Sequence, residues 1–70
     1  MHSQYEAARQ LLAAGAFIEQ MSDAPLTYRI RLGSGSTPFP GWLVQQLLAH
    51  QVIRPSCRVS GRMRFVATAV

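Results

Sequence analysis

Three arginines surround a Ser-Gly pair in the segment CRVSGRMRFVA, which spans residues 57–67 of this 70-residue chain. They are Arg58, Arg62 and Arg64. The guanidinium group of arginine is planar and always charged, and it can donate two parallel hydrogen bonds to a phosphate or a carboxylate. The chemistry that these residues could support is therefore the binding of an anion.

The acidic residues that could neutralise these arginines are concentrated at the other end of the chain. All seven basic residues are arginine, whereas the three acids are Glu6, Glu19 and Asp23. Residues 24–70 therefore contain six arginines and no carboxylate. Such a segment cannot neutralise its own charge, so its field must meet solvent, the N-terminal acids or an anionic partner. A GC-rich genome would explain the missing lysine but not the missing acids.

Composition and length indicate a single folded domain over residues 1–70. Hydrophobic residues make up 49% of the chain, which is ordinary for a globular protein. A chain of this length buries only about 60% of the surface that it exposes when unfolded, so forming a homodimer would supplement its small core. The sequence shows no signal-peptide pattern and no apolar run long enough for a bilayer, and we expect a cytoplasmic protein.

Catalysis is not expected from these residue types. Cys57 is the only cysteine, which excludes an intrachain disulfide, and no spacing supports a Cys57–His50 nucleophilic couple. Two histidines and one cysteine that are widely dispersed do not make a zinc site. The glycines and serines at residues 33–36 lack the lysine and the Ser/Thr of a phosphate loop. We expect no catalytic residue, no metal and no cofactor, and we expect residues 33–36 to form a mobile loop.

A capping box indicates where the first helix begins. Ser3 can accept a hydrogen bond from the backbone N–H of Glu6, whose side chain can reach back. Gly15 tolerates the left-handed conformation that ends a helix. These residues predict a helix over residues 4–14. Its buried stripe comprises Tyr5, Ala8, Leu12 and Ala16.

Residues 26–32 alternate between apolar and polar side chains, which is typical of a half-buried strand. The inward residues are Leu26, Tyr28, Ile30 and Leu32. Arg29 and Arg31 point to the opposite, exposed face. We expect this strand to form a hairpin with a short strand at residues 17–21, joined by a turn at residues 22–25.

A second helix is predicted over residues 39–51, with Thr37 as its cap and a proline in its first turn. Its core face consists of Leu43, Val44, Leu47 and Leu48. The opposite side of this helix contains Trp42, Gln45, Gln46, Ala49 and His50, with Phe39 close to Gln46.

The C-terminal residues predict a second hairpin. One strand covers residues 52–59 and the other covers residues 62–68, with the Ser-Gly pair as the turn. Pro55 belongs at an edge or a bulge, because it cannot donate a hydrogen bond to a neighbouring strand.

The predicted order of helix, hairpin, helix and basic hairpin resembles that of a winged-helix DNA-binding domain. The resemblance rests on topology and charge, and it implies a small α+β winged-helix-like domain whose helix at residues 39–51 enters a groove of DNA. The wing would comprise Arg58, Ser60, Gly61, Arg62 and Arg64. Winged-helix proteins usually place two helices before the wing, whereas residues 26–32 indicate a strand. Either residues 37–40 contain a short helical turn, or the fold is a different small α+β arrangement.

We expect a small basic protein that binds double-stranded DNA in a regulatory or mobile-element context. Arginines would neutralise phosphates, and Gln45 and Gln46 would read adenine in the major groove, although ordinary surface glutamines fit the same pattern. The expected nucleic-acid-binding residues are Arg29, Arg31, Gln45, Gln46, His50, Arg54, Arg58, Arg62 and Arg64. Binding of single strands is less favoured, because Tyr28 and Phe65 alternate onto the apolar face and cannot stack on bases.

The alternative is a protein-binding module, such as a small phage-type inhibitor or adaptor. Trp42, Phe39 and arginines are residue types that form interface hot spots. An acidic protein surface would attract the same arginines as a phosphate backbone does. Composition alone does not distinguish the two hypotheses.

Overall fold

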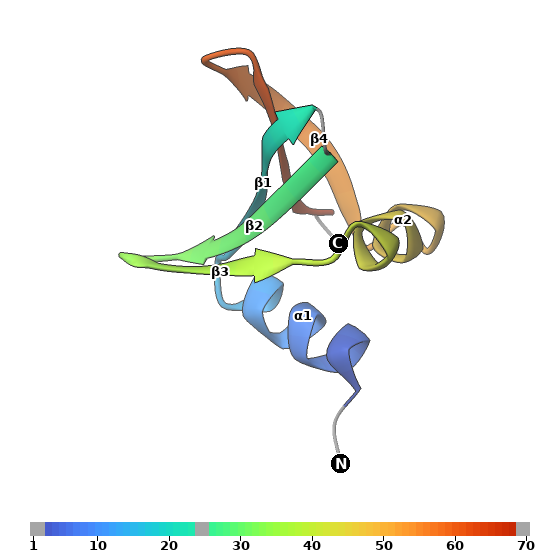
Figure 1. Cartoon of the computed structure of the whole chain (residues 1–70). Helices are drawn as coiled ribbons and strands as arrows, with labels where there is room; N and C mark the ends of the chain where they lie inside the picture. Colours follow the sequence, from blue (N-terminus) through green and yellow to red (C-terminus); the bar gives the residue numbers. More distant parts are fainter. Residues whose placement is uncertain (1–2, 24–25, 69–70) are drawn as a thin grey trace.

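The computed structural model describes residues 3–23 and 26–68 (Figure 1). The chain forms a small α+β fold. Its elements, in chain order, are α1 (Gln4–Ala13), β1 (Phe17–Asp23), β2 (Leu26–Leu32), β3 (Gly35–Phe39), α2 (Gly41–Ala49), β4 (Ile53–Val59) and β5 (Arg62–Ala67). In the described part of the chain, neither helix is long and apolar enough to cross a membrane.

The strands form one five-stranded sheet in the order β3-β2-β1-β5-β4, with every neighbouring pair antiparallel. Three of the four strand pairs join strands that follow one another along the chain. The fourth pairs β1 with β5, at Ile18 opposite Phe65 and at Glu19 opposite Arg64. The outer strands are β3 and β4. Within β3, Pro38 lies opposite Arg29 of β2.

Both helices pack on the same face of this sheet. Side chains alternate along a strand, and residues directly opposite one another in a ladder share a face. Ile18, Ile30 and Phe65 therefore point to one face, where they join the core with α1 and α2. The core residues are Ala8, Leu12, Ala16, Ile18, Tyr28, Ile30, Leu43, Val44, Leu47, Ile53 and Phe65. The stripes that periodicity predicts on both helices are thus largely confirmed.

We call the other face of the sheet, which carries Glu19 and Arg29, the open face. The ladder places five of the seven arginines on it. They are Arg29, Arg31, Arg54, Arg62 and Arg64. The predicted division of β2 into an apolar and an arginine-bearing face is confirmed, although Leu26 and Leu32 at its ends are exposed.

Each helix ends in the same hydrogen-bonded motif. At the end of α1, Gly15 N–H donates to the Leu12 carbonyl and Ala16 N–H donates to the Leu11 carbonyl, both at 3.0 Å. Gly15 adopts the predicted left-handed conformation, with φ of 106°. The same pair of bonds closes α2, and there the left-handed residue is Gln51, with φ of 59°. The first helix also begins as predicted, because Ser3 Oγ accepts from Glu6 N–H at 3.1 Å.

The segment between β2 and α2 differs from the prediction. Residues 35–39 form strand β3 rather than a mobile loop followed by a helix start, and Thr37 pairs with Ile30 instead of capping α2. Gly33, with φ of 60°, makes the turn between β2 and β3. The second helix begins at Gly41, after Pro40 as its N-cap residue. Of the predicted turn at residues 22–25, positions 24 and 25 lie outside the described residues.

The extra strand changes the layout that the sequence predicts. The observed order is helix, three strands, helix, two strands, and all five strands belong to one sheet. This strand-rich layout differs from the helix, hairpin, helix, hairpin order on which the winged-helix resemblance rests. The C-terminal hairpin itself is confirmed, with Pro55 in an edge strand and beside a bulge.

The end of α2 generates a prediction about stability. Gln51→Gly should raise the free energy of unfolding by about 0.5–1 kcal/mol, because a left-handed conformation costs a residue with a Cβ about 1–2 kcal/mol and part of that gain is offset by the entropy of unfolded glycine. Urea denaturation measures the change. The matched control is Gln10→Gly within α1, which should lower stability by about 1 kcal/mol. Equal effects of the two substitutions would contradict this account.

Candidate functional site

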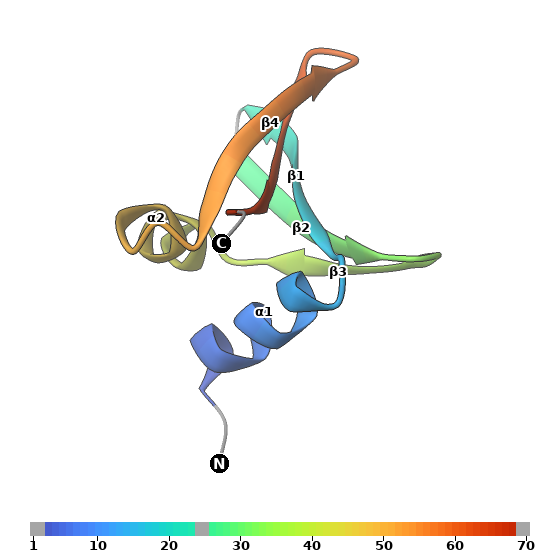
Figure 2. The same ribbon diagram turned by 180° about the vertical axis from the view of Figure 1, so that it is seen from behind.

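The β4–β5 hairpin, residues 53–67, projects from the body of the molecule, and we call it the arm (Figures 1 and 2). Its tip lies away from both helices in the two views. Ser60 and Gly61 form the two-residue turn, with φ of 53° and 78°. Positive φ at both positions is the requirement of the type I′ turn, whose twist matches that of the flanking strands.

A bulge in β4 determines which face of the arm each arginine occupies. Pro55 lies opposite Phe65 and Arg58 lies opposite Met63, so Ser56 and Cys57 together face a single residue of β5. A one-residue insertion of this kind reverses the facing of every later residue in the strand. Arg58 therefore lies on the helix-bearing side, while Arg54 and Arg62 lie on the side that continues the open face. The arm displays arginine on both of its faces.

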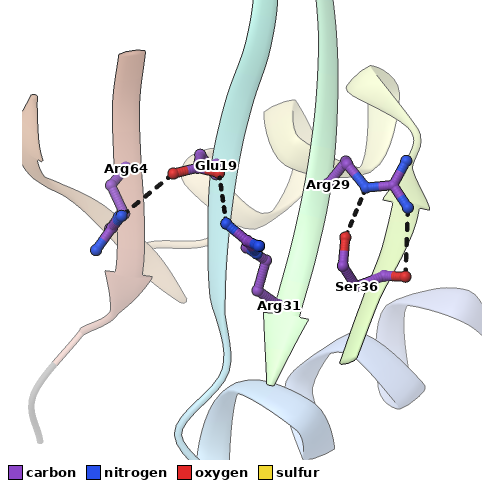
Figure 3. Close-up of polar contacts among 5 residues, drawn as sticks. All are labelled: Glu19, Arg29, Arg31, Ser36 and Arg64. Carbon is purple, nitrogen blue, oxygen red and sulfur yellow. Dashed lines mark hydrogen bonds and ion pairs between the residues drawn. The ribbon is translucent and has the colours of Figure 1, made fainter. Parts of the chain in front are cut away.

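The centre of the open face holds a carboxylate between two guanidinium groups. Glu19, on β1, is only 6% exposed. Its Oε1 accepts from Arg31 Nη1 of β2 at 3.3 Å, and its Oε2 accepts from Arg64 Nη2 of β5 at 3.2 Å (Figure 3). A buried carboxylate needs such partners, because an unpaired charge in a desolvated position is costly. Glu19 thereby links the two strands that flank β1.

Arg64 is also held by its packing. Its guanidinium carbon lies 4.3 Å from the centre of the Phe17 ring, a distance that favours a cation–π interaction. The Nε atom is buried and has no hydrogen-bond partner among the described residues. The Arg64 side chain is 29% exposed, compared with 46% for Arg31. Arg64 is therefore part of the sheet's structure as well as a surface charge.

Arg29 is bound by a neutral partner instead. Its Nε donates to Ser36 Oγ at 2.6 Å, and its Nη2 donates to the Ser36 backbone carbonyl at 3.3 Å (Figure 3). These bonds orient the side chain toward β3 without cancelling its charge.

The remaining arm arginines have no such contacts. Arg54, Arg58 and Arg62 are exposed, and they make no hydrogen bond or ion pair with any other residue in the described part of the chain. Among the wing arginines, Arg58 and Arg62 thus have no acidic partner within the described residues, whereas Arg64 pairs with Glu19. The sequence left open that the N-terminal acids would meet the charge of residues 24–70, and Glu19 does so for Arg31 and Arg64. Sequence reasoning missed Glu19 because its burial depends on the pairing of β1 with β5, whose Arg64 lies 45 positions away along the chain.

The residues expected on the second helix lie elsewhere. Gln45 and Gln46 are exposed on α2, and His50 is exposed at its C-cap. Because α2 packs on the face opposite the open face, the structure does not bring these residues together with the open-face arginines. The His50 ring makes an edge contact with Tyr5, with 5.5 Å between the ring centres.

The two aromatic residues expected to bind a partner differ in their surroundings. Trp42, near the start of α2, is 59% exposed. Phe39 belongs to β3, lies opposite Tyr28 and packs against the core. The structure therefore leaves Trp42 available on the surface and gives Phe39 a role in the fold.

No protein-family model, no curated protein and no solved structure matches this chain.

The Glu19 cluster predicts a difference between two arginines of the same strand. Arg64→Ala should lower the free energy of unfolding by about 1–3 kcal/mol, because it removes a partner of a buried carboxylate and uncovers Phe17. Arg62→Ala, two residues away on the same face, should change it by no more than about 0.5 kcal/mol. Urea denaturation of both variants tests this, and similar losses of stability would show that Glu19 does not depend on Arg64.

Proposed function

We propose that the protein binds double-stranded DNA and that the arm makes the principal contacts. The observation that carries this proposal is the placement of three exposed arginines without a described partner on a projecting two-stranded hairpin. Guanidinium groups that are not neutralised within the protein are available to phosphate oxygens.

The shape of the arm supports this interpretation. The major groove of B-DNA is about 12 Å wide and admits a two-stranded β-ribbon. A phosphate backbone borders the groove on each side, so a ribbon inserted there benefits from positive charge on both of its faces. The bulge provides that arrangement, with Arg58 on one face and Arg54 and Arg62 on the other. Phosphate contacts of this type fix position and carry little sequence information.

A winged-helix mode of docking stays a prediction. In that mode α2 would enter the groove, with Gln45, Gln46 and His50 toward the bases, and the arm would serve as the wing. Because α2 and the open face lie on opposite sides of the sheet, a DNA contact made by the arm and the open face would leave these three residues outside the interface.

A duplex titration over a range of salt concentrations tests the proposed function. If Arg54, Arg58 and Arg62 each contact one phosphate, log K against log salt should slope by about −2.7, and each single alanine substitution should make the slope less steep by about 0.9. Arg9→Ala on α1 is the matched control, because it removes the same charge from a different surface and should leave the slope unchanged. A protein without measurable affinity for duplex at low salt would contradict the proposal.

Trp42 distinguishes docking by the arm from docking by the second helix. It is the only tryptophan in the chain and lies on α2, so its fluorescence reports on that helix alone. We expect saturating duplex to leave its emission maximum unchanged. A pronounced shift would place α2 at the DNA and favour the winged-helix mode.

A second candidate function is recognition of an acidic protein surface, which the exposure of Trp42 favours. This alternative predicts that DNA binding is weak and blind to sequence, and that a specific protein partner is lost with Trp42→Ala. A partner that remains bound to this variant would remove the argument from Trp42.

A further inference from the structure

We propose that Glu19 withholds Arg31 and Arg64 from DNA and so limits the phosphate contacts to the arginines with which it does not pair. This inference rests on the proposed function and concerns the number of phosphates that the protein neutralises. Five arginines share the open face, but the carboxylate at its centre pairs with two of them. Glu19 would therefore decide which of the exposed charges a polyanion can use.

The energetic reason lies in the burial of Glu19. Its side chain is only 8% exposed, so the two arginines supply interactions that water cannot easily replace. A phosphate that drew Arg31 or Arg64 away would leave a buried carboxylate with a missing partner, and such a charge is strongly destabilising. The approaching phosphate would also meet the negative charge of Glu19 itself. Both effects favour the pairing within the protein over pairing with DNA.

Neighbouring arginines on the same face provide the contrast. Arg62 is two residues from Arg64 on β5, faces the same side and has no partner among the described residues. Arg29 is opposite Glu19 in the ladder, yet its side chain turns to Ser36, which is neutral. These arginines of the open face therefore differ in their partners. Arg31 and Arg64 pair with a carboxylate, Arg29 bonds to a neutral serine, and Arg62 has no partner among the described residues.

The consequence concerns binding that does not depend on sequence. Affinity for a polyanion, and its dependence on salt, increase with the number of phosphates that the protein neutralises. By engaging two guanidinium groups, Glu19 limits this general attraction to the arginines that remain unpaired with it. Glu19 therefore adjusts the affinity for a polyanion without itself touching DNA.

The experiment compares two glutamate substitutions in the full chain with a mixed-sequence duplex as the probe. Glu19→Gln should release two arginines, strengthen duplex binding by roughly tenfold at 0.1 M salt and steepen the salt slope by up to about 1.8. Glu6→Gln is the matched control, because it changes the net charge equally but faces Arg9 on α1, at 4.0 Å. It should alter the affinity much less and leave the slope unchanged. Equal effects of the two variants would overturn the proposal, because net charge alone would then explain them.

A second comparison decides the matter even if Glu19→Gln does not fold. With Glu19 unchanged, Arg31→Ala should leave the duplex affinity within about twofold of the wild-type value, because Arg31 is already paired with Glu19. Arg62→Ala should lower the affinity and make the salt slope less steep by about 0.9, the value expected for one phosphate contact. Circular dichroism verifies that both variants are folded. If Arg31→Ala weakens binding as much as Arg62→Ala, Glu19 does not withhold Arg31.

The two proposals fail in different ways. A wild-type protein that does not bind duplex at low salt removes the proposed function. A wild-type protein that binds through the arm, but whose affinity depends on Arg31 as much as on Arg62, removes only the role of Glu19.

Discussion

The contact between β1 and β5 is the constraint on which the architecture depends. Every other strand pair in the described chain joins two consecutive strands, whereas this contact brings together residues that lie 45 positions apart. It rests on two adjacent residue pairs, one on each face of the sheet. Ile18 and Phe65 meet in the core, and Glu19 meets Arg64 on the open face. The first pair contributes apolar burial, and the second supplies one of the two partners of a buried carboxylate. The arm is attached to the body of the protein at this point.

The alternation of side chains along the strands separates most of the arginines from the hydrophobic core of this small domain. Both helices cover one face of the sheet, where Ile18 of β1, Ile30 of β2 and Phe65 of β5 contribute to the core. The arginines of the same strands alternate to the other face, where solvent or a partner can reach them. Beyond the contact with β1, the arm is a two-stranded ribbon, and its charged residues are unconstrained by the packing of the core. The apolar packing and most of the exposed arginine charge thereby lie on different parts of the same strands.

Local signals in the sequence were sufficient for much of this fold. The capping residue Ser3, the glycine at position 15, the alternation in β2 and the Ser-Gly turn of the arm each act through neighbouring residues, and the structure confirms each of them. Strand β3 was missed because Gly35 and Pro38 are residues that strands usually avoid, and its pairing with β2 overrides that preference. The face on which Arg58 lies was not predictable either. The residues around the bulge are mostly polar, so their pattern does not show where the extra residue is inserted. Glu19 was overlooked for a related reason, since the burial of a charge depends on tertiary partners that no local pattern reveals.

The two prolines at the margins of the sheet have a consequence for self-association. Pro38 lies in β3 and Pro55 lies in β4, which are the outermost strands on either side. Proline offers no amide hydrogen to an incoming strand, and a bulge beside it further disturbs the register that a neighbour would need. Extension of the sheet from one molecule to the next, and the fibrous aggregation that follows from it, are therefore discouraged at both borders. Two copies of this chain that do associate would meet through side chains rather than by joining their backbones into one continuous ladder.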